Sequence, residues 1–356
     1  MKIKSMELVS VDLKLSEPYS IAYETIEHAV NLFLKIETNK GLFGFGCAAP
    51  DLEVTGETAE SVRKVFNDWI EPRMHGCDPL RYVYHLERLR SGLQKHPSAM
   101  AMLDMALLDL LGKASCMPLF KLLGGFRTCM KTSITIGILP LTETVEKAEM
   151  YVKKGFAILK VKGGSDVDLD IERIARIRER IGIKTLIRFD ANQGYSFEDS
   201  IRFINDTRSY KIELLEQPTP KKEWEVLGHV TRESHLPIMA DESIMNLVDA
   251  FKLAKNDLVD TVNIKIQKVG GINEALHINS VSKAANFEVM VGCLDESALG
   301  ISAGLHFALA RPNVHYADLD GHFDIIDDPF AGSVILKKGT LYPNNLPGLG
   351  VVNTLF

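Results

Sequence analysis

The chain has 356 residues, of which 46% are hydrophobic and 25% charged, as in a folded globular protein with a sizeable core. Its net charge of −6 gives no electrostatic reason to expect binding to nucleic acid or to an anionic membrane. The five cysteines form no Cys-x-x-Cys pair, residues 1–15 resemble a strand more than a signal peptide, and no apolar run reaches the roughly 20 residues that span a bilayer. We therefore expect a cytoplasmic protein. The sequence leaves its oligomeric state open, a homo-oligomer included.

Residues 1–125 are expected to form an α+β domain. Alternating polar and apolar residues predict strands at 3–13 and 32–37, and a turn at 41–46 leads into a third strand. Helical patterns then follow, at 57–70, 79–91 and 98–114. Strands first and helices afterwards are typical of an α+β domain. Its polar loops at 16–25 and 48–57 are free to reach a ligand.

From residue 126 onwards, short apolar runs alternate with helical patterns. The predicted strands are 132–137, 157–161, 185–189, 212–215, 236–240, 259–264, 287–292 and 314–317, with helices at 141–154, 168–181, 196–207 and 246–256 among them. This interval matches the roughly 25 to 30 residues that a strand, a helix and two loops require. We predict an α/β fold, a (β/α)7β modified TIM barrel over 126–320. The domain 1–125 caps the barrel, and the tail 321–356 returns to that cap.

Three successive predicted strands each end in a carboxylate, namely Asp190, Glu216 and Asp241. The carboxyl ends of barrel strands share one mouth, so these acids should meet, and without a cation they would repel one another. Ligands that are all oxygen favour Mg²⁺ over Zn²⁺. The alternative is that they are ordinary acids on a solvated rim.

Lysines end the second and sixth predicted strands. Lys160 and Lys162 are two residues apart and share one face, while Lys265 lies across the acids from them. A neighbouring positive charge lowers the pKa of a lysine, which prepares Lys162 to act as a base. Lys162 and Lys265 can therefore transfer a proton α to a carboxylate, through a metal-stabilised enediolate. Proton transfer on both faces of the α-carbon gives racemisation or epimerisation. Proton removal from one face alone allows loss of a β-leaving group. Lys268, placed in the loop after the strand, is a less suitable base than Lys265.

These motifs together resemble the enolase superfamily, in its muconate lactonising enzyme branch, and most closely the dipeptide epimerases. The motifs are Lys-Val-Lys at 160–162, Asp-Ala-Asn at 190–192, Glu-Gln-Pro at 216–218, Ala-Asp-Glu-Ser at 240–243 and Asn-Ile-Lys at 263–265. The resemblance covers essentially the whole chain. Enzymes of this superfamily combine a lysine or histidine base with Mg²⁺. The resemblance implies Mg²⁺ ligands (Asp190, Glu216, Asp241), an acid/base pair (Lys162, Lys265), an amine beside the substrate carboxylate (Lys160) and supporting residues (Asn192, Glu242).

The eighth predicted strand narrows the resemblance to one reaction. Asp318 and Asp320 resemble the pair that dipeptide epimerases use to hold the substrate α-ammonium, and two carboxylates can satisfy its three donors. The implied enzyme is a Mg²⁺-dependent dipeptide epimerase that inverts the α-carbon of the C-terminal residue by two-base 1,1-proton transfer. A dipeptide would be its small-molecule partner.

The side-chain preference is a separate hypothesis. Epimerases specific for Ala-Glu resemble one another in a first-loop arginine, whereas this chain has Glu24 there and no arginine before Arg63. Asp295 follows the seventh predicted strand. Glu24 and Asp295 predict a cationic dipeptide by charge complementarity. The alternative is an apolar pocket formed by Ile21, Tyr23, Leu52 and Val54.

Other functions share part of this pattern. N-succinylamino acid racemase, o-succinylbenzoate synthase and muconate cycloisomerase use the same metal and lysines, but their substrates lack the free α-ammonium that would require Asp318 and Asp320. A non-enzymatic alternative is a barrel that serves as a binding or scaffold protein. The presence of all three acids and all three lysines argues against it.

Overall fold

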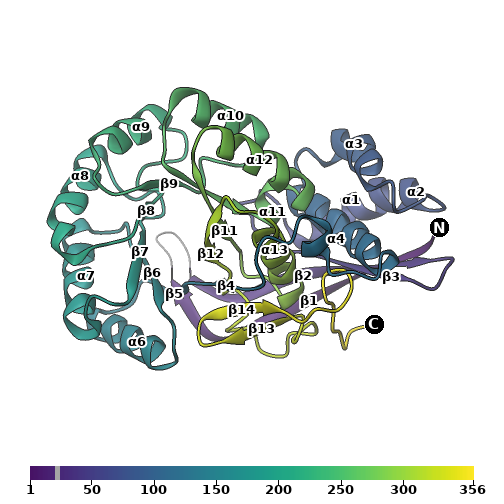
Figure 1. Cartoon of the computed structure of the whole chain (residues 1–356), viewed down its shortest axis with the longest axis horizontal. Helices are drawn as coiled ribbons and strands as arrows, with labels where there is room; N and C mark the ends of the chain where they lie inside the picture. The colour runs from purple at the N-terminus through teal and green to yellow at the C-terminus, as the bar shows by residue number, and fades with distance from the viewer. Residues whose placement is uncertain (21–24) are drawn as a thin grey trace.

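The computed structural model describes residues 1–20 and 25–356, and Figure 1 shows the chain path. Glu24, Ile21 and Tyr23, which enter the two side-chain hypotheses, lie outside the described residues.

Eight parallel strands form one sheet that curves into a nearly closed barrel, as predicted (Figure 1). In sheet order they are β5 (Ile134–Ile136), β6 (Ile158–Lys162), β7 (Leu186–Asp190), β8 (Leu215–Glu216), β9 (Ile238–Ala240), β10 (Thr261–Lys265), β11 (Glu288–Gly292) and β12 (Val314–Asp318). The helices between them are α6 (Leu141–Lys153), α7 (Val167–Ile181), α8 (Phe197–Asp206), α9 (Trp224–Glu233), α10 (Leu247–Asn256), α11 (Ile266–Val269), α12 (Ile272–Ala284) and α13 (Ala298–Ala310). Lys162 pairs with Asp190 and Asp190 with Glu216, so these strands end level at the mouth.

Side chains help to close the seam between the first and last barrel strands. The Ser133 backbone N–H donates to the Ala317 carbonyl at 3.1 Å, and the Ser133 hydroxyl donates to Asp318 at 2.6 Å. The backbone N–H of Thr135 donates to Asp320 at 2.6 Å. Asp318 and Asp320, predicted only as ligands for substrate, therefore also hold β12 against β5.

The cap begins with an antiparallel sheet of β1 (Ile3–Ser20), β2 (Thr25–Thr38) and β3 (Phe43–Ala48), followed by α1 (Ala59–Val65), α2 (Glu71–Met74), α3 (Tyr82–Leu93) and α4 (Pro97–Ala114). A short helix α5 (Leu119–Leu122) leads towards the barrel. Helix α4 lies directly on β3, because Gly44 and Gly46 have no Cβ atoms to collide with the carbonyl oxygens of Ala106 and Met102. This close contact buries one face of the sheet and gives the cap its own core.

The C-terminal tail packs back onto the cap. Its strands β13 (Val334–Lys337) and β14 (Thr340–Pro343) form a small sheet with β4 (Met130–Lys131). The Leu349 N–H donates to Asp109 of α4 at 2.8 Å, and the Phe330 ring packs on Phe33 of β2 with centroids 4.7 Å apart. The domain limits at residues 125 and 320 stay predictions. Among the described helices, none is both long and apolar enough to cross a membrane.

One buried carboxyl joins the cap to the barrel. Asp104 of α4 is fully buried and accepts a hydrogen bond of 2.6 Å from the Ile272 N–H, at the start of α12. Helix α4 lies between β3 and the barrel helices α11 and α12 (Figure 1). Burial raises the pKa of Asp104 to about 7.

This raised pKa predicts a pH-dependent stability. Between about pH 4 and pH 7 the unfolded chain has lost the Asp104 proton while the folded chain keeps it, so the free energy of unfolding falls as pH rises. Asp104→Asn is uncharged at every pH and keeps a carbonyl for the Ile272 N–H. Urea unfolding should show a shallower fall over this range in the variant than in the wild type. An equal fall in both proteins would contradict the assignment.

Candidate active site

The three acids predicted as metal ligands meet at the barrel mouth. Asp190 ends β7, Glu216 ends β8 and Asp241 directly follows β9, and all three are buried. One carboxylate oxygen from each lies within 4.8 Å of those of the other two. The equal register of the parallel strands brings them together, as the motif spacing predicted.

Lys160 stands at the centre of this acidic cluster. Its Nζ lies 3.0 Å from Asp190, 2.8 Å from Glu216 and 2.9 Å from Asp318. Burial by itself would lower the pKa of Lys160, but the surrounding carboxylates outweigh it and hold this pKa well above its usual value. Lys160 therefore carries a fixed positive charge between the acids and the last barrel strand.

The two lysines predicted as acid and base contact different acids. The Lys162 Nζ lies 2.7 Å from Asp190, whereas the Lys265 Nζ lies 2.9 Å from Asp241. Their strands, β6 and β10, are separated by three others in the sheet. Burial opposes the charge on Lys265, but Asp241 outweighs it and raises the pKa of that lysine. Two amines therefore flank the acids from different sides.

Lys268 was predicted to lie in a loop, and this prediction was wrong. This residue lies in the short helix α11 and is buried, because the backbone turns into a helix directly after Lys265. Its Nζ donates to an Asp241 carboxylate oxygen at 2.5 Å and to the Asn263 carbonyl at 3.1 Å. Lys265 lines the cavity in front of the acids and Lys268 is not among its lining residues.

Residues of the quoted motifs hold the acids in place, and no role was predicted for Asn263 and Gln217 among them. Asn263 donates to Glu216 at 2.8 Å, and the Gln217 side-chain oxygen accepts from the Asp241 N–H at 2.9 Å. The Asn192 N–H donates to Asp190 at 2.9 Å. The side-chain oxygen of Asn192 and one carboxylate oxygen of Glu242 are buried with no hydrogen-bond partner in the described part of the chain. Both residues line the cavity, so these acceptors are available to a ligand.

The donor set at the triad fits a hard divalent cation. Oxygen atoms are the only atoms that the triad offers, and Glu216 Oε2 is contacted by the Lys160 ammonium at 2.8 Å. Burial and the charge of Asp190 raise the pKa of Glu216 to about 8, and the charge of Lys160 opposes this shift. A cation that prefers carboxylate oxygens, such as Mg²⁺, suits this arrangement better than Zn²⁺.

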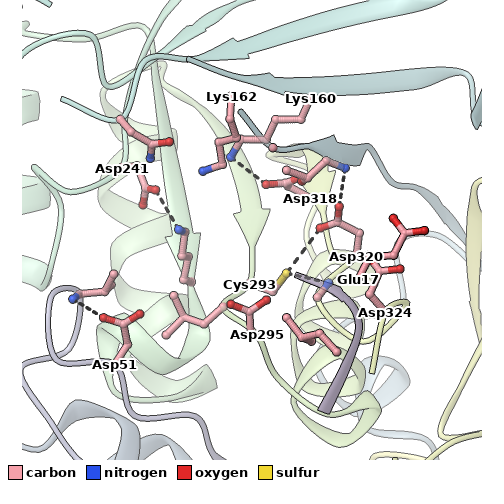
Figure 2. A pocket seen from close by; sticks show the side chains of 18 of the residues that line it. Glu17, Asp51, Lys160, Lys162, Asp241, Cys293, Asp295, Asp318, Asp320 and Asp324 are labelled. Atoms are coloured by element: carbon pink, nitrogen blue, oxygen red, sulfur yellow. Dashed lines mark hydrogen bonds and ion pairs between the residues drawn. The ribbon is translucent and has the colours of Figure 1, made fainter. Parts of the chain in front are cut away.

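A cavity that is open to solvent lies in front of the acids and lysines. Asp318 and Asp320 form part of its wall, with the Lys160 ammonium against Asp318 (Figure 2). Burial and the neighbouring Asp318 raise the pKa of Asp320 to about 7. The Cys293 thiol lies 3.8 Å from Asp320. The predicted pair thus faces the same cavity as the triad.

Four further acids line this cavity, namely Glu17, Asp51, Asp295 and Asp324 (Figure 2). They come from β1, the loop after β3, the loop after β11 and the segment after β12. Glu17 forms an ion pair of 2.8 Å with Lys147 of α6. Only Asp295 of these four was singled out in the sequence, because the others do not stand at predicted strand ends.

The barrel, its cap and the acid–lysine cluster define a class of enzyme, and comparison with known proteins identifies the family. Residues 3–124 match the mandelate racemase / muconate lactonizing enzyme N-terminal domain, and residues 143–353 match the enolase C-terminal domain-like family. The chain belongs to the enolase superfamily, as its motifs predicted.

Its relatives include dipeptide epimerases of different specificity. The chain is 38% identical to a hydrophobic dipeptide epimerase of Enterococcus faecalis and 38% identical to an L-Lys-D/L-Arg epimerase of Desulforapulum autotrophicum, covering 99% of both chains in each case. A dipeptide epimerase of Methylococcus capsulatus, solved with Mg and L-Arg-D-Lys, has a TM-score of 0.95 and 37% identity over 99% of this chain and 100% of that one. The near-equal identities do not select a side-chain preference.

The triad predicts measurable Mg²⁺ binding. Mg²⁺ should raise the melting temperature of the wild-type protein, because a ligand that binds only the folded state stabilises it. Glu216→Gln removes one anionic ligand. It should weaken the affinity for Mn²⁺, used in place of Mg²⁺ because electron paramagnetic resonance detects it, by roughly tenfold or more. Glu198→Gln, at an exposed position of α8, is the matched control. Equal Mn²⁺ affinity in the wild type and Glu216→Gln would show that Glu216 is not a ligand of the metal.

Proposed function

We propose that the protein is a Mg²⁺-dependent dipeptide epimerase that inverts the α-carbon of the C-terminal residue. The observation that carries this proposal is the placement of two amines, those of the partly buried Lys162 and the buried Lys265, on different members of one acidic triad. Family membership and the activities of the relatives support it. A binding or scaffold barrel has no use for two amines that flank the same point.

In this proposal Asp190, Glu216 and Asp241 are the ligands of Mg²⁺. The cation supplies positive charge that stabilises the substrate carboxylate when its α-carbon loses a proton, and that lowers the pKa of the lysines nearby. Asn192 and Glu242 support the ligands, and the Lys160 ammonium lies beside the substrate carboxylate.

In each direction of the reaction, one lysine takes a proton from the α-carbon and the other lysine gives one to it. The neutral Nζ of one lysine removes the α-proton from one face, and the ammonium of the other delivers a proton to the opposite face. Lys162 and Lys265 trade these roles when the opposite stereoisomer binds. The net change is inversion at one carbon, without loss of any group.

Asp318 and Asp320 are proposed to hold the α-ammonium of the N-terminal residue. They line the same cavity as the lysines, and their carboxylates can accept from an ammonium. N-succinylamino acids carry no such ammonium, which is why a dipeptide fits this wall better.

The preferred dipeptide is proposed to be cationic. Glu17, Asp51, Asp295 and Asp324 line the cavity together with one lysine outside the catalytic cluster, Lys147, and this lysine is paired with Glu17. A basic side chain gains from such a wall, and an acidic one is repelled. Of the two relatives at 38% identity, the L-Lys-D/L-Arg epimerase agrees with this preference and the hydrophobic dipeptide epimerase does not. Val54 also lines the cavity, so apolar dipeptides remain the competing substrates to test. Glu24 keeps its proposed role as a further acid.

The proposed location is the cytoplasm. All five cysteines are free, and free thiols are typical of a reducing compartment.

Solvent exchange tests the reaction. In D₂O with Mg²⁺, wild-type protein should add one deuterium to L,L-dipeptides, fastest for Lys- and Arg-containing ones, as measured by mass spectrometry. If exchange is fastest on apolar dipeptides, the proposed reaction is supported and the proposed preference for cationic dipeptides is contradicted. Exchange only on N-succinylamino acids would replace the dipeptide by that substrate class.

Lysine variants test the two-base scheme. Lys162→Ala and Lys265→Ala should each lose epimerisation by roughly 10²-fold or more, because a positioned acid or base contributes at least that factor. Each variant should keep α-proton exchange for only one stereoisomer, the one whose proton faces the remaining lysine. Chiral chromatography follows the products. Epimerisation at the wild-type rate in either variant would disprove the scheme.

The raised pKa of Asp320 predicts a pH dependence of substrate binding. Below about pH 7 Asp320 is protonated and cannot pair with an ammonium, so kcat/KM should rise as pH increases through 7. Asp320→Asn keeps an acceptor for the Thr135 N–H but removes the charge. It should flatten this rise and raise KM roughly tenfold.

An N-acetylated dipeptide, which has no α-ammonium, is the control substrate. Wild-type protein and Asp320→Asn should handle it alike, and a large difference between them would assign Asp320 a role other than holding the ammonium.

A further inference from the structure

Gln267 occupies an unusual position between two lysines of the site. It lies in α11, two residues after Lys265 and one before Lys268, and its side chain is fully buried. An amide without partners is costly to bury, so a glutamine at such a place needs hydrogen bonds. Gln267 is not among the residues that line the cavity, so its partners are protein groups.

Those partners lie in the cap, more than two hundred residues away. The Gln267 side-chain oxygen accepts from the Ala49 N–H at 3.2 Å, and its NH₂ donates to the Cys47 carbonyl at 3.1 Å. The Cys47 carbonyl belongs to β3, an outer strand of the cap sheet, and the Ala49 N–H comes directly after the end of that strand. The Gln267 side-chain amide, which belongs to the barrel, therefore forms hydrogen bonds to the cap backbone of the kind that a neighbouring strand would form.

A second contact of the same amide reaches the loop that follows β11. The Gln267 NH₂ donates to Glu296 at 2.9 Å, and Glu296 also accepts from the Leu294 N–H at 3.3 Å. Asn31 of β2 holds the other side of this loop, because it donates to the Asp295 carbonyl at 3.1 Å and accepts from the Ser297 N–H at 2.9 Å. The loop that carries Asp295 is thereby attached to the barrel and to the cap at once.

Both attachments lie close in sequence to residues of the cavity wall. Asp51 follows the Gln267 partner Ala49 by two residues, and Asp295 lies inside the loop held by Glu296 and Asn31. Asp51 and Asp295 line the cavity from two separate segments (Figure 2). Their separation therefore depends on how β3 and the β11 loop are joined, and Gln267 contacts both.

We propose that Gln267 is a positioning residue for side-chain specificity, which holds Asp51 of the cap and Asp295 of the barrel at a fixed separation beside the catalytic Lys265. This inference rests on the proposed function, because it assigns to that site the means by which it selects a basic side chain. Substrate recognition is thereby coupled to the catalytic segment through one amide.

The test replaces Gln267 by methionine, which has a similar volume and no hydrogen-bonding amide. Gln267→Met should raise KM for L-Lys-L-Lys roughly tenfold, as expected for the loss of about 1.4 kcal/mol in binding, and lower kcat less than about threefold. The preference for L-Lys-L-Lys over L-Ala-L-Ala should fall by a similar factor. Gln94→Met, at an exposed position after α3, is the matched control and should match the wild type.

A merely structural role gives a different result. It would lower kcat/KM for both dipeptides by the same factor, and that outcome, or an unchanged preference, would overturn the proposal. Asn31→Ala releases the same loop from the cap side and serves as the second variant if Gln267→Met does not fold. Asn31→Ala should likewise raise KM strongly and lower kcat only slightly.

A readout without substrate separates this proposal from the proposed function. Amide hydrogen exchange of the peptide that contains Ala49 should accelerate in Gln267→Met relative to the wild type and Gln94→Met, because the Ala49 N–H loses its acceptor. If the wild type acts on no dipeptide and this exchange still accelerates, the proposed function has failed while the attachment holds. Unchanged exchange at Ala49 would disprove the attachment itself.

Discussion

Three carboxylates buried at one point are the constraint on which the rest of this barrel mouth depends. Burying a charge is costly unless opposite charges or hydrogen bonds accompany it. The chain meets this requirement with amines, placing Lys160 among Asp190, Glu216 and Asp318, and two further lysines on Asp241. The strands must therefore bring acids and lysines to the same level, and the equal register of parallel strands does so.

The same charges connect catalysis to the closure of the barrel. Asp318 accepts from Lys160 at the centre of the site and from Ser133 across the seam, while Asp320 accepts from the Thr135 backbone. The residues proposed to hold the substrate α-ammonium are thus fixed by the strands that complete the fold. A rigid pair of carboxylates can orient an ammonium because little conformational freedom is lost on binding. The fold itself provides this preorganisation.

Much of the site was predictable from the sequence, for a local reason. Parallel strands of a barrel end at one mouth, so strand-end residues such as Asp190, Glu216 and Lys265 can be assigned to it from their interval along the chain. The helix after β10 was missed, because Ile266–Val269 is only one turn long and has no helical periodicity to detect. The Asp51 position was missed for a different reason, since it lies in a loop of the cap.

The sequence by itself determined the strand–helix alternation, the barrel class, the acid and lysine motifs at the strand ends and the resemblance to the enolase superfamily. These features are local, and a repeat of about 25 residues is sufficient to reveal them. Only the tertiary structure decided that Lys268 contacts Asp241, that Asp318 pairs with Lys160 and that Gln267 completes the edge of the cap sheet. Such contacts depend on loop paths and side-chain conformations that no local pattern specifies. The pairs Lys160–Asp318 and Gln267–Cys47 join residues 158 and 220 positions apart.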